Sequence, residues 1–341
     1  MSGDYLWDRS GPRDAGVAEL ERVLGALRQA DPPPPLRLRG PVPVQTSASK
    51  VRWLIGMMAT AAAVTALVGV VWFSHLDQAP RLDVVALAGT PTIGTRPVGD
   101  RASLTAGPWL ETDQHARAGI DVGDIGRVEL EPRSRLGLVS TRPGDYRLRL
   151  QRGTMHALIW APPGQFFVET PSSTAVDLGC SYTLSIDDAG VGLVQVTTGW
   201  VGFEWHGRES FIPAGAVCLT RPGLGPGTPH YPDTSDAYRE ALQMIDVGGG
   251  TAGARHAALG LILRDSRAHD VVTLWHLLAR VDAEWRGEIF DRLAAFVPPP
   301  AGVTRDGVAA GRRDMLDQWW DALGLGTASW WRTWKQQWRE K

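Results

Sequence analysis

Residues 146–160, YRLRLQRGTMHALIW, carry the pattern that decides the fold class of most of this chain. Within this stretch the apolar residues Tyr146, Leu148 and Leu150 alternate with arginines, which places apolar and charged side chains on opposite faces of an extended strand. Short apolar runs of this kind recur at intervals of about ten residues, separated by Gly, Pro, Asp and Ser. Alternation with frequent turns is typical of an antiparallel sandwich or roll, so we expect an all-β domain over residues 82–220.

The apolar spacing changes after the turn-rich stretch 221–229, and from Ser235 onward it is helical. Paired helices at this spacing resemble a helical-hairpin array of the HEAT type, so we expect an all-α region over residues 235–325. The expected helices lie near 235–246, 253–264, 268–280 and 282–296, with a further helix from about Asp306 to Leu323.

An uncharged run, residues 53–73, precedes the β region. As a helix it spans roughly 30 Å, the thickness of a bilayer's hydrocarbon core, and a buried core helix is the less fitting alternative. Trp53 and Trp72 stand at the ends, where indoles favour the membrane interface, and Lys50 and Arg52 precede the run. These features predict an α+β multi-domain membrane protein of the bacterial inner membrane. It would be single-pass, with a cytoplasmic N-terminus and periplasmic C-terminal domains.

The N-terminal arm, residues 1–52, contains one periodic segment, at about 14–30, followed by a Pro-rich spacer. Steps of three and four residues place an apolar stripe on one face of a short helix, and the arm offers nothing to cover it. Three apolar residues ahead of the helix resemble the anchors of helix-in-groove recognition. The arm therefore predicts a partner-binding segment, with the candidate residues Tyr5, Leu6, Trp7, Val17, Leu20, Leu24 and Leu27.

Several short motifs follow one another in a fixed order in the β region. They are Gly126-Arg127-Val128-Glu129-Leu130 ahead of Ser134, a strand with Leu148 and Leu150 that ends at Gly153, Phe166-x-Val168-x-Thr170, Val176 to Leu184 with Gly179 inside, Val194-x-Val196-x-x-Gly199-x-Val201, and the turn Pro213-Ala214-Gly215. In this order, over roughly 95–220, they resemble the FecR domain of transmembrane regulators.

The resemblance implies an anti-sigma-factor-like protein, which senses an envelope signal and controls a cytoplasmic sigma factor through its N-terminal arm. The alternative is an envelope ligand-binding or scaffold protein with no regulatory function for the arm. Its partner would be a polysaccharide or another envelope protein, with Trp200 and Trp205 as ligand platforms.

The two cysteines, Cys180 and Cys218, both follow the uncharged run. In an oxidising compartment they would form a disulfide that stabilises the fold by roughly 3–4 kcal/mol. The alternative is a pair of small buried side chains. Compared with the FecR pattern, Cys180 stands in place of a Thr, and Cys218 in place of an apolar residue.

The C-terminal tail, residues 326–341, combines tryptophans with basic residues. Trp331, Trp334 and Trp338 are spaced for one face of a helix. Such a helix either rests on the membrane surface or packs back on the helical region.

Signatures of catalysis and of nucleic-acid binding are missing. The chain has no G-x-S-x-G, H-E-x-x-H or phosphate-binding loop, and its eight histidines show no ligand spacing. With 35 Lys and Arg against 37 Asp and Glu, it lacks the net positive charge of a nucleic-acid-binding protein. We therefore expect no enzyme activity, metal or cofactor, and no direct contact with nucleic acid.

Overall fold

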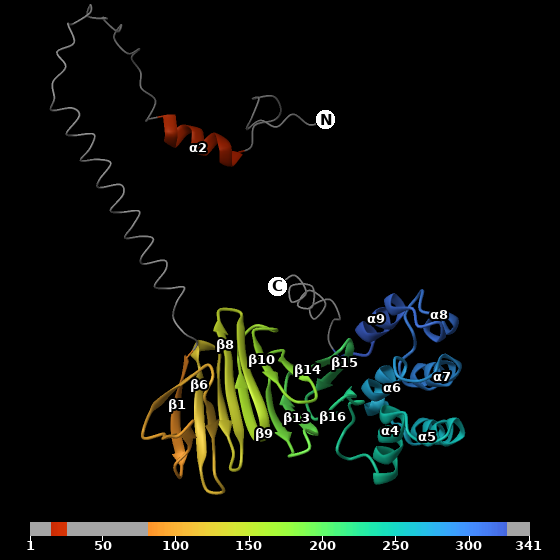
Figure 1. The fold of residues 1–341 in the computed structure, drawn as a ribbon. Coiled ribbons are helices and arrows are strands. Elements are labelled where there is room, and N and C mark those ends of the chain that lie inside the picture. Colours follow the sequence, from red (N-terminus) through yellow and green to blue (C-terminus); the bar gives the residue numbers. More distant parts are fainter. Residues whose placement is uncertain (1–14, 26–80, 326–341) are drawn as a thin grey trace, which may run out of the picture. The chain divides into compact units, whose positions relative to one another are not determined.

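A computed structural model describes residues 15–25 and 81–325 (Figure 1). These residues belong to two compact units, 1–76 and 77–341, which are described separately. In the first unit, helix α2 spans Ala15–Gly25, within the helix expected at about 14–30. All strands and the remaining helices described below lie in the second unit.

The second unit contains seventeen described strands, paired into two sheets that share the long strand β9 (Asp145–Ile159). The first sheet has the order β4 (Ala102–Thr105), β1 (Arg81–Ala88), β6 (Arg117–Val122), β7 (Gly126–Leu130), β9, β12 (Ser181–Ile186), β13 (Gly192–Thr198), β16 (Val217–Arg221) and β17 (Gly225–Pro226). The second has the order β3 (Arg96–Pro97), β2 (Thr92–Ile93), β5 (Trp109–Glu111), β8 (Arg135–Arg142), β9, β10 (Phe166–Glu169), β11 (Thr174–Asp177), β14 (Trp200–Trp205) and β15 (Arg208–Pro213). Only the pairing of β9 with β10 is parallel among these strands.

Strand β9 passes from one sheet to the other at Gly153. Up to Arg152 it pairs with β8, and from Gly153 onward it pairs with β12. Gly153 has a φ of 91°, and a Cβ atom there would lie 2.1 Å from the Ser134 hydroxyl oxygen. Only glycine fits this close, left-handed corner. The Gly that ends the alternating run of arginines and leucines is therefore the point at which the two sheets are joined.

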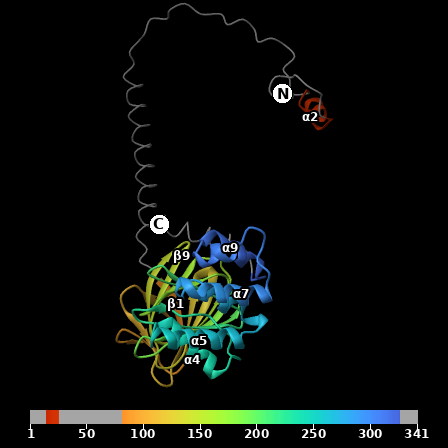
Figure 2. The same cartoon turned by 90° about the vertical axis from the view of Figure 1, so that its right-hand side faces the viewer.

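The helices follow the last strand and face the viewer in Figure 2. They are α4 (Asp236–Val247), α5 (Ala252–Asp265), α6 (Val271–Leu277), α7 (Arg286–Phe296), α8 (Arg305–Ala309) and α9 (Arg313–Ala322). Two 3-10 turns, Ala268–Asp270 and Ala283–Trp285, lie among these helices, and a third, Gly123–Ile125, lies between β6 and β7. Where we expected one helix from Asp306 to Leu323, the chain forms α8 and α9. Gly311 lies between them with a φ of 76°, a conformation that interrupts a right-handed helix.

The expected fold class, an α+β multi-domain membrane protein, is wrong. The described chain is mostly β, and one cluster of buried apolar side chains runs from the strands into the helices. Phe211 on β15 and Trp200 on β14 lie 5.9 and 5.8 Å, between ring centroids, from Trp320 on α9. The helices therefore cover strand residues that would otherwise be exposed. The domain boundaries at 82–220 and 235–325, and the HEAT-type arrangement, stay predictions.

The expected localisation, a single pass through the inner membrane, is also contradicted. Within residues 15–25 and 81–325 no helix is long and apolar enough to cross a membrane. The longest of them, α5, has 14 residues and extends about 21 Å, short of the roughly 30 Å of hydrocarbon. The run at 53–73 and its flanking residues Trp53, Trp72, Lys50 and Arg52 lie outside the described residues.

Candidate functional site

Part of the apolar stripe predicted for the N-terminal arm, Leu20 and Leu24, is exposed on helix α2. Leu20 and Leu24 are 62% and 50% exposed, and Val23 between them is 66% exposed. The only ion pair described on this helix joins Arg22 to Glu19 at 3.5 Å, between two exposed side chains. Clustered exposure of large apolar side chains is typical of interaction surfaces in general.

The other residues predicted for partner binding are only partly covered by the structure. The backbone of Val17 belongs to α2. Tyr5, Leu6, Trp7 and Leu27 lie outside the described residues, so their part in a binding site stays a prediction.

A cleft of about 670 Å³ lies in the second unit, between the turn after β14 and the helical region. Its apolar wall is formed by Phe211 of β15, Trp275 of α6 and Leu316 of α9. The Trp275 indole N–H donates to the Leu316 carbonyl at 2.9 Å, which fixes the ring against α9. This size is in the range of sites that hold small molecules.

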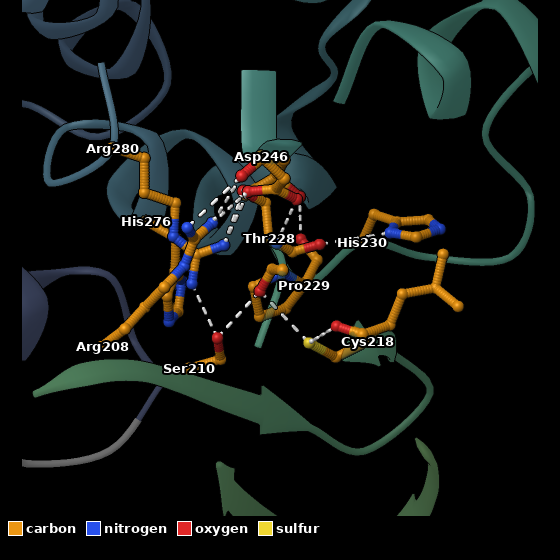
Figure 3. Close-up of polar contacts among 12 residues, drawn as sticks. Arg208, Ser210, Cys218, Thr228, Pro229, His230, Asp246, His276 and Arg280 are labelled. Atoms are coloured by element: carbon orange, nitrogen blue, oxygen red, sulfur yellow. Dashed lines mark hydrogen bonds and ion pairs between the residues drawn. The ribbon is translucent and has the colours of Figure 1, made fainter. Parts of the chain in front are cut away.

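A buried polar cluster lies behind the cleft and joins β15, α4 and the turn after α6 (Figure 3). Asp246 on α4 accepts from the guanidinium groups of Arg208 and Arg280 at 3.0 and 3.1 Å. It also accepts from the Thr228 backbone N–H at 2.6 Å. Arg280 donates further to the Ser210 hydroxyl at 2.6 Å. A buried guanidinium is tolerated only where acceptors surround it, and this cluster supplies them.

Burial determines the protonation states in this cluster. Desolvation lowers the pKa of the Arg280 guanidinium, while the nearby Asp246 carboxylate opposes that shift. Desolvation and the charge of Arg280 lower the pKa of His276 to about 3. The Phe211 backbone N–H donates to His276 Nε2 at 2.9 Å, and Nδ1 lies 2.7 Å from the Val272 carbonyl. His276 is therefore a neutral imidazole with its proton on Nδ1.

The structure does not bring Cys180 and Cys218 together. Both are free, buried thiols. Cys218 pairs with Val194, which pairs with Leu184 in turn, and Cys180 lies four residues before Leu184. Two strand spacings and four residues place the Cα atoms roughly 15 Å apart, well beyond the reach of a disulfide. The Cys218 Sγ donates instead to the Gly227 carbonyl at 3.2 Å.

Cys180 belongs to a second buried polar group. Its Sγ donates to Asp177 Oδ2 at 2.7 Å. Desolvation raises the pKa of Asp177 to about 7, and desolvation followed by the Asp177 charge raises that of Cys180. The Tyr182 hydroxyl is buried and has no hydrogen-bond partner among the described residues. A thiol with a raised pKa is a poor nucleophile, so this group has a structural character.

The two tryptophans that the scaffold alternative names as ligand platforms already make ring contacts within the chain. Trp200 packs against Trp320, as described above, and Trp205 makes an edge contact with His206 at 4.7 Å between ring centroids. Among the described residues no cluster of His, Cys, Asp or Glu has the geometry of a metal site. Trp331, Trp334 and Trp338 of the tail lie outside the described residues.

Sequence reasoning missed both the cleft and the polar cluster. Arg208, Thr228, Asp246 and Arg280 are separated by about twenty to thirty-five residues each, and no local pattern links them. A signal did exist in Asp246, a charged residue near the C-terminal end of α4, where the helix dipole disfavours an anion. Such a position indicates a cationic partner elsewhere in the chain.

No family model and no curated protein matches the sequence. Two crystal structures of a candidate anti-sigma factor from Parabacteroides distasonis, at 2.50 and 1.65 Å, are similar to part of it. Each has 13% sequence identity and a TM-score of 0.32, over 40% of this chain and 64% of the solved chain. The chain thus matches less than two thirds of the length of these neighbours. They are of the anti-sigma-factor kind, but a likeness this weak leaves the function to be argued from the residues.

Proposed function

We propose that this chain is a non-enzymatic regulator that binds a sigma factor through the exposed apolar face of helix α2. The observation that carries the proposal is the exposure of Leu20, Val23 and Leu24 on one side of an eleven-residue helix. Transferring each of these side chains from water into a groove stabilises a complex by about 1.5–3 kcal/mol.

The length of α2 supports a role in binding. Isolated helices of fewer than about 12–15 residues are marginally stable in water, because nucleation is unfavourable and a short helix forms few backbone hydrogen bonds to offset it. A groove that covers the apolar face also stabilises the helix, so binding and helix formation reinforce each other.

The β region supports a regulatory function through the order of its motifs, which resembles that of the FecR domain. The structure also explains why glycine stands at two positions of these motifs. Gly199 has a φ of 71°, and a Cβ atom there would lie 2.1 Å from the carbonyl oxygen of Gly179, the glycine of the preceding motif. The two motif glycines lie against each other at a tight corner. These motifs therefore serve the fold, and we assign recognition of the sigma factor to α2.

Co-purification tests the proposal. The full chain, carrying an affinity tag, is expressed together with each sigma-70-type factor of the organism that encodes it. The wild-type chain is expected to retain the sigma factor, and Leu20→Asp/Leu24→Asp to lose it, because two carboxylates in an apolar groove lack partners.

The matched control is Ala18→Asp/Gly25→Asp, which adds the same two charges to the opposite side of α2. This control is expected to retain the sigma factor. The proposal is refuted if both double variants retain the sigma factor. It is also refuted if neither the wild type nor the control retains it.

A further inference from the structure

The cleft beside β15 has a charge imbalance that its own residues do not neutralise. Four arginines line it, together with the carboxylates Glu209 and Asp317. Arg208 and Arg280 share one carboxylate, Asp246, behind the cleft wall. Arg313 lies 3.5 Å from Glu209. Within residues 15–25 and 81–325, Arg286 has no carboxylate at ion-pair distance, and the cleft keeps an excess of positive charge.

Arg286 is held in place without being neutralised. Its Nη1 donates to the Ala309 carbonyl at 3.2 Å. Gly311 makes room for it, since a Cβ atom there would lie 2.7 Å from the same nitrogen. A positioned guanidinium with remaining donors suits a carboxylate, phosphate or sulfonate group.

The lining of the cleft also includes aromatic side chains that are held by ring contacts. Phe211 and Trp275 are packed against the ring of Trp320, at 5.9 and 4.7 Å between centroids. The neutral His276 adds no charge to this wall, because its pKa is about 3. Packed aromatic rings and a positioned guanidinium in the same cleft lower the cost of ordering a bound molecule.

We infer that this cleft binds an organic anion, a molecule with one carboxylate, phosphate or sulfonate group on an aromatic or other apolar body. The anionic group pairs with Arg286, and the apolar body lies against Phe211, Trp275 and Leu316. This inference does not depend on binding of a sigma factor by α2.

The sequence of the tail argues against the chain itself as the occupant. Residues 326–341 contain Arg332, Lys335, Arg339 and Lys341 against the single acidic residue Glu340. A cationic segment is repelled by a cleft with excess positive charge, whereas an anionic ligand is attracted to it.

Two fluorescent probes with nearly the same aromatic body test the inference on the full chain. The first, 8-anilinonaphthalene-1-sulfonate, carries an anionic group, and the second, N-phenyl-1-naphthylamine, carries none. We expect saturable 1:1 binding of the sulfonate. Arg286→Gln is expected to weaken it at least about tenfold, because a hydrogen-bonded ion pair is lost. Binding of the neutral probe is expected to change less than about twofold.

Control variants make the result specific. Arg264→Gln removes an exposed arginine of α5 outside the cleft and is expected to leave binding unchanged. Gly311→Ala displaces the Arg286 guanidinium and is expected to weaken binding of the sulfonate. Thermal unfolding confirms that each variant is folded, and Gly311→Ala carries the test if Arg286→Gln is not folded.

Three results would overturn the inference. The first is no saturable binding of the sulfonate by the full chain. The second is an equal response of binding to Arg286→Gln and Arg264→Gln, which indicates a general surface effect. The third is binding that occurs only after residues 326–341 are deleted, which would make the tail the occupant of the cleft.

Discussion

Helices α2 and α6 carry similar apolar side chains, but those of α6 are buried and those described on α2 are exposed. In α6 (Val271–Leu277) every residue except Trp275 is buried, and Val272, Leu274 and Leu277 have no exposed surface. In α2, Leu20, Val23 and Leu24 are all at least half exposed. The difference comes from what surrounds each helix, because α6 contacts strand β15 through His276 and helix α9 through Trp275.

This contrast separates structural from functional use of an apolar helix. The residues of α6 are needed to complete the core of their own unit, and their loss is expected to unfold it. The exposed residues of α2 add nothing to that core, and their loss is expected to affect a partner only. The predictions below test each side of this contrast.

The largest effect is expected at the ionic contacts beside α6. Asp246→Ala leaves the guanidinium of Arg280, only 5% exposed, without its carboxylate. Removing one partner of a buried ion pair costs about 3–5 kcal/mol. Chemical denaturation of the full chain measures the loss of unfolding free energy.

The matched control is Asp291→Ala, which breaks the pair with Arg305 on the surface of α7. That pair has a shorter distance, 2.9 Å, but both side chains are more than half exposed. It is expected to cost no more than about 1 kcal/mol. Equal losses for the two variants would show that burial does not strengthen the Asp246 contacts.

The apolar residues give a nearly equal contrast. Leu277→Ala on α6 is expected to cost about 2–5 kcal/mol, because it leaves a cavity in a closed core. Leu24→Ala on α2 is expected to change the unfolding free energy by less than about 0.5 kcal/mol. A loss above 1 kcal/mol for Leu24→Ala would mean that the chain itself covers this face, contrary to the comparison.

The buried carboxylates extend the contrast to pH. Asp246 is paired with two arginines, whereas burial without a cation raises the pKa of Asp177 to about 7. Between about pH 4 and pH 7 the folded protein holds a proton on Asp177 that the unfolded chain releases. This contribution to stability is complete below pH 4 and is lost as pH rises through 7, by roughly 2–4 kcal/mol.

Asp177→Asn removes this dependence, since an amide does not titrate. The unfolding free energy at pH 4.5 minus that at pH 8 is expected to be lower for the variant than for the wild type, because the variant lacks the stabilisation that protonated Asp177 gives at low pH. His276 acts in the opposite direction, because its folded pKa of about 3 makes stability fall as pH decreases below 6.5. An unchanged pH profile in Asp177→Asn would contradict the raised pKa.

The smallest effect on stability is expected from charges on α2. Leu20→Asp/Leu24→Asp should leave the thermal unfolding of the second unit unchanged, because both leucines are exposed and neither belongs to the buried apolar cluster. Differential scanning calorimetry checks this. A lower midpoint for the second unit would place these leucines in its core.

The sequence predicts regular structure well where the signal is local. Helices α4 and α5 lie within one residue of their expected ends, because caps at Ser235 and Thr251 mark their beginnings. The turn at Gly311 divides the last expected helix into two, and the spacing of apolar residues does not predict it. Gly311 has a left-handed conformation, and the Arg286 guanidinium lies where a Cβ atom would be.

The candidate sites divide in the same way. The stripe of α2 follows from residue spacing alone, and of its leucines the structure describes Leu20 and Leu24, both exposed. The cleft and the Asp246 cluster depend on contacts between residues far apart in the sequence, such as Arg208 with Asp246, 38 positions apart. The cysteines illustrate the converse, since their co-occurrence in one β region indicated a bridge that the strand order separates.

The central claim is that the exposed face of α2 is covered by a sigma factor. Amide hydrogen exchange of the full chain, with and without the sigma factor that co-purifies with it, tests this most directly. We predict slower exchange across residues 15–25 in the complex, abolished by Leu20→Asp/Leu24→Asp and retained in Ala18→Asp/Gly25→Asp. Unchanged exchange in 15–25 at saturating sigma factor, or protection confined to residues 81–325, would contradict the account.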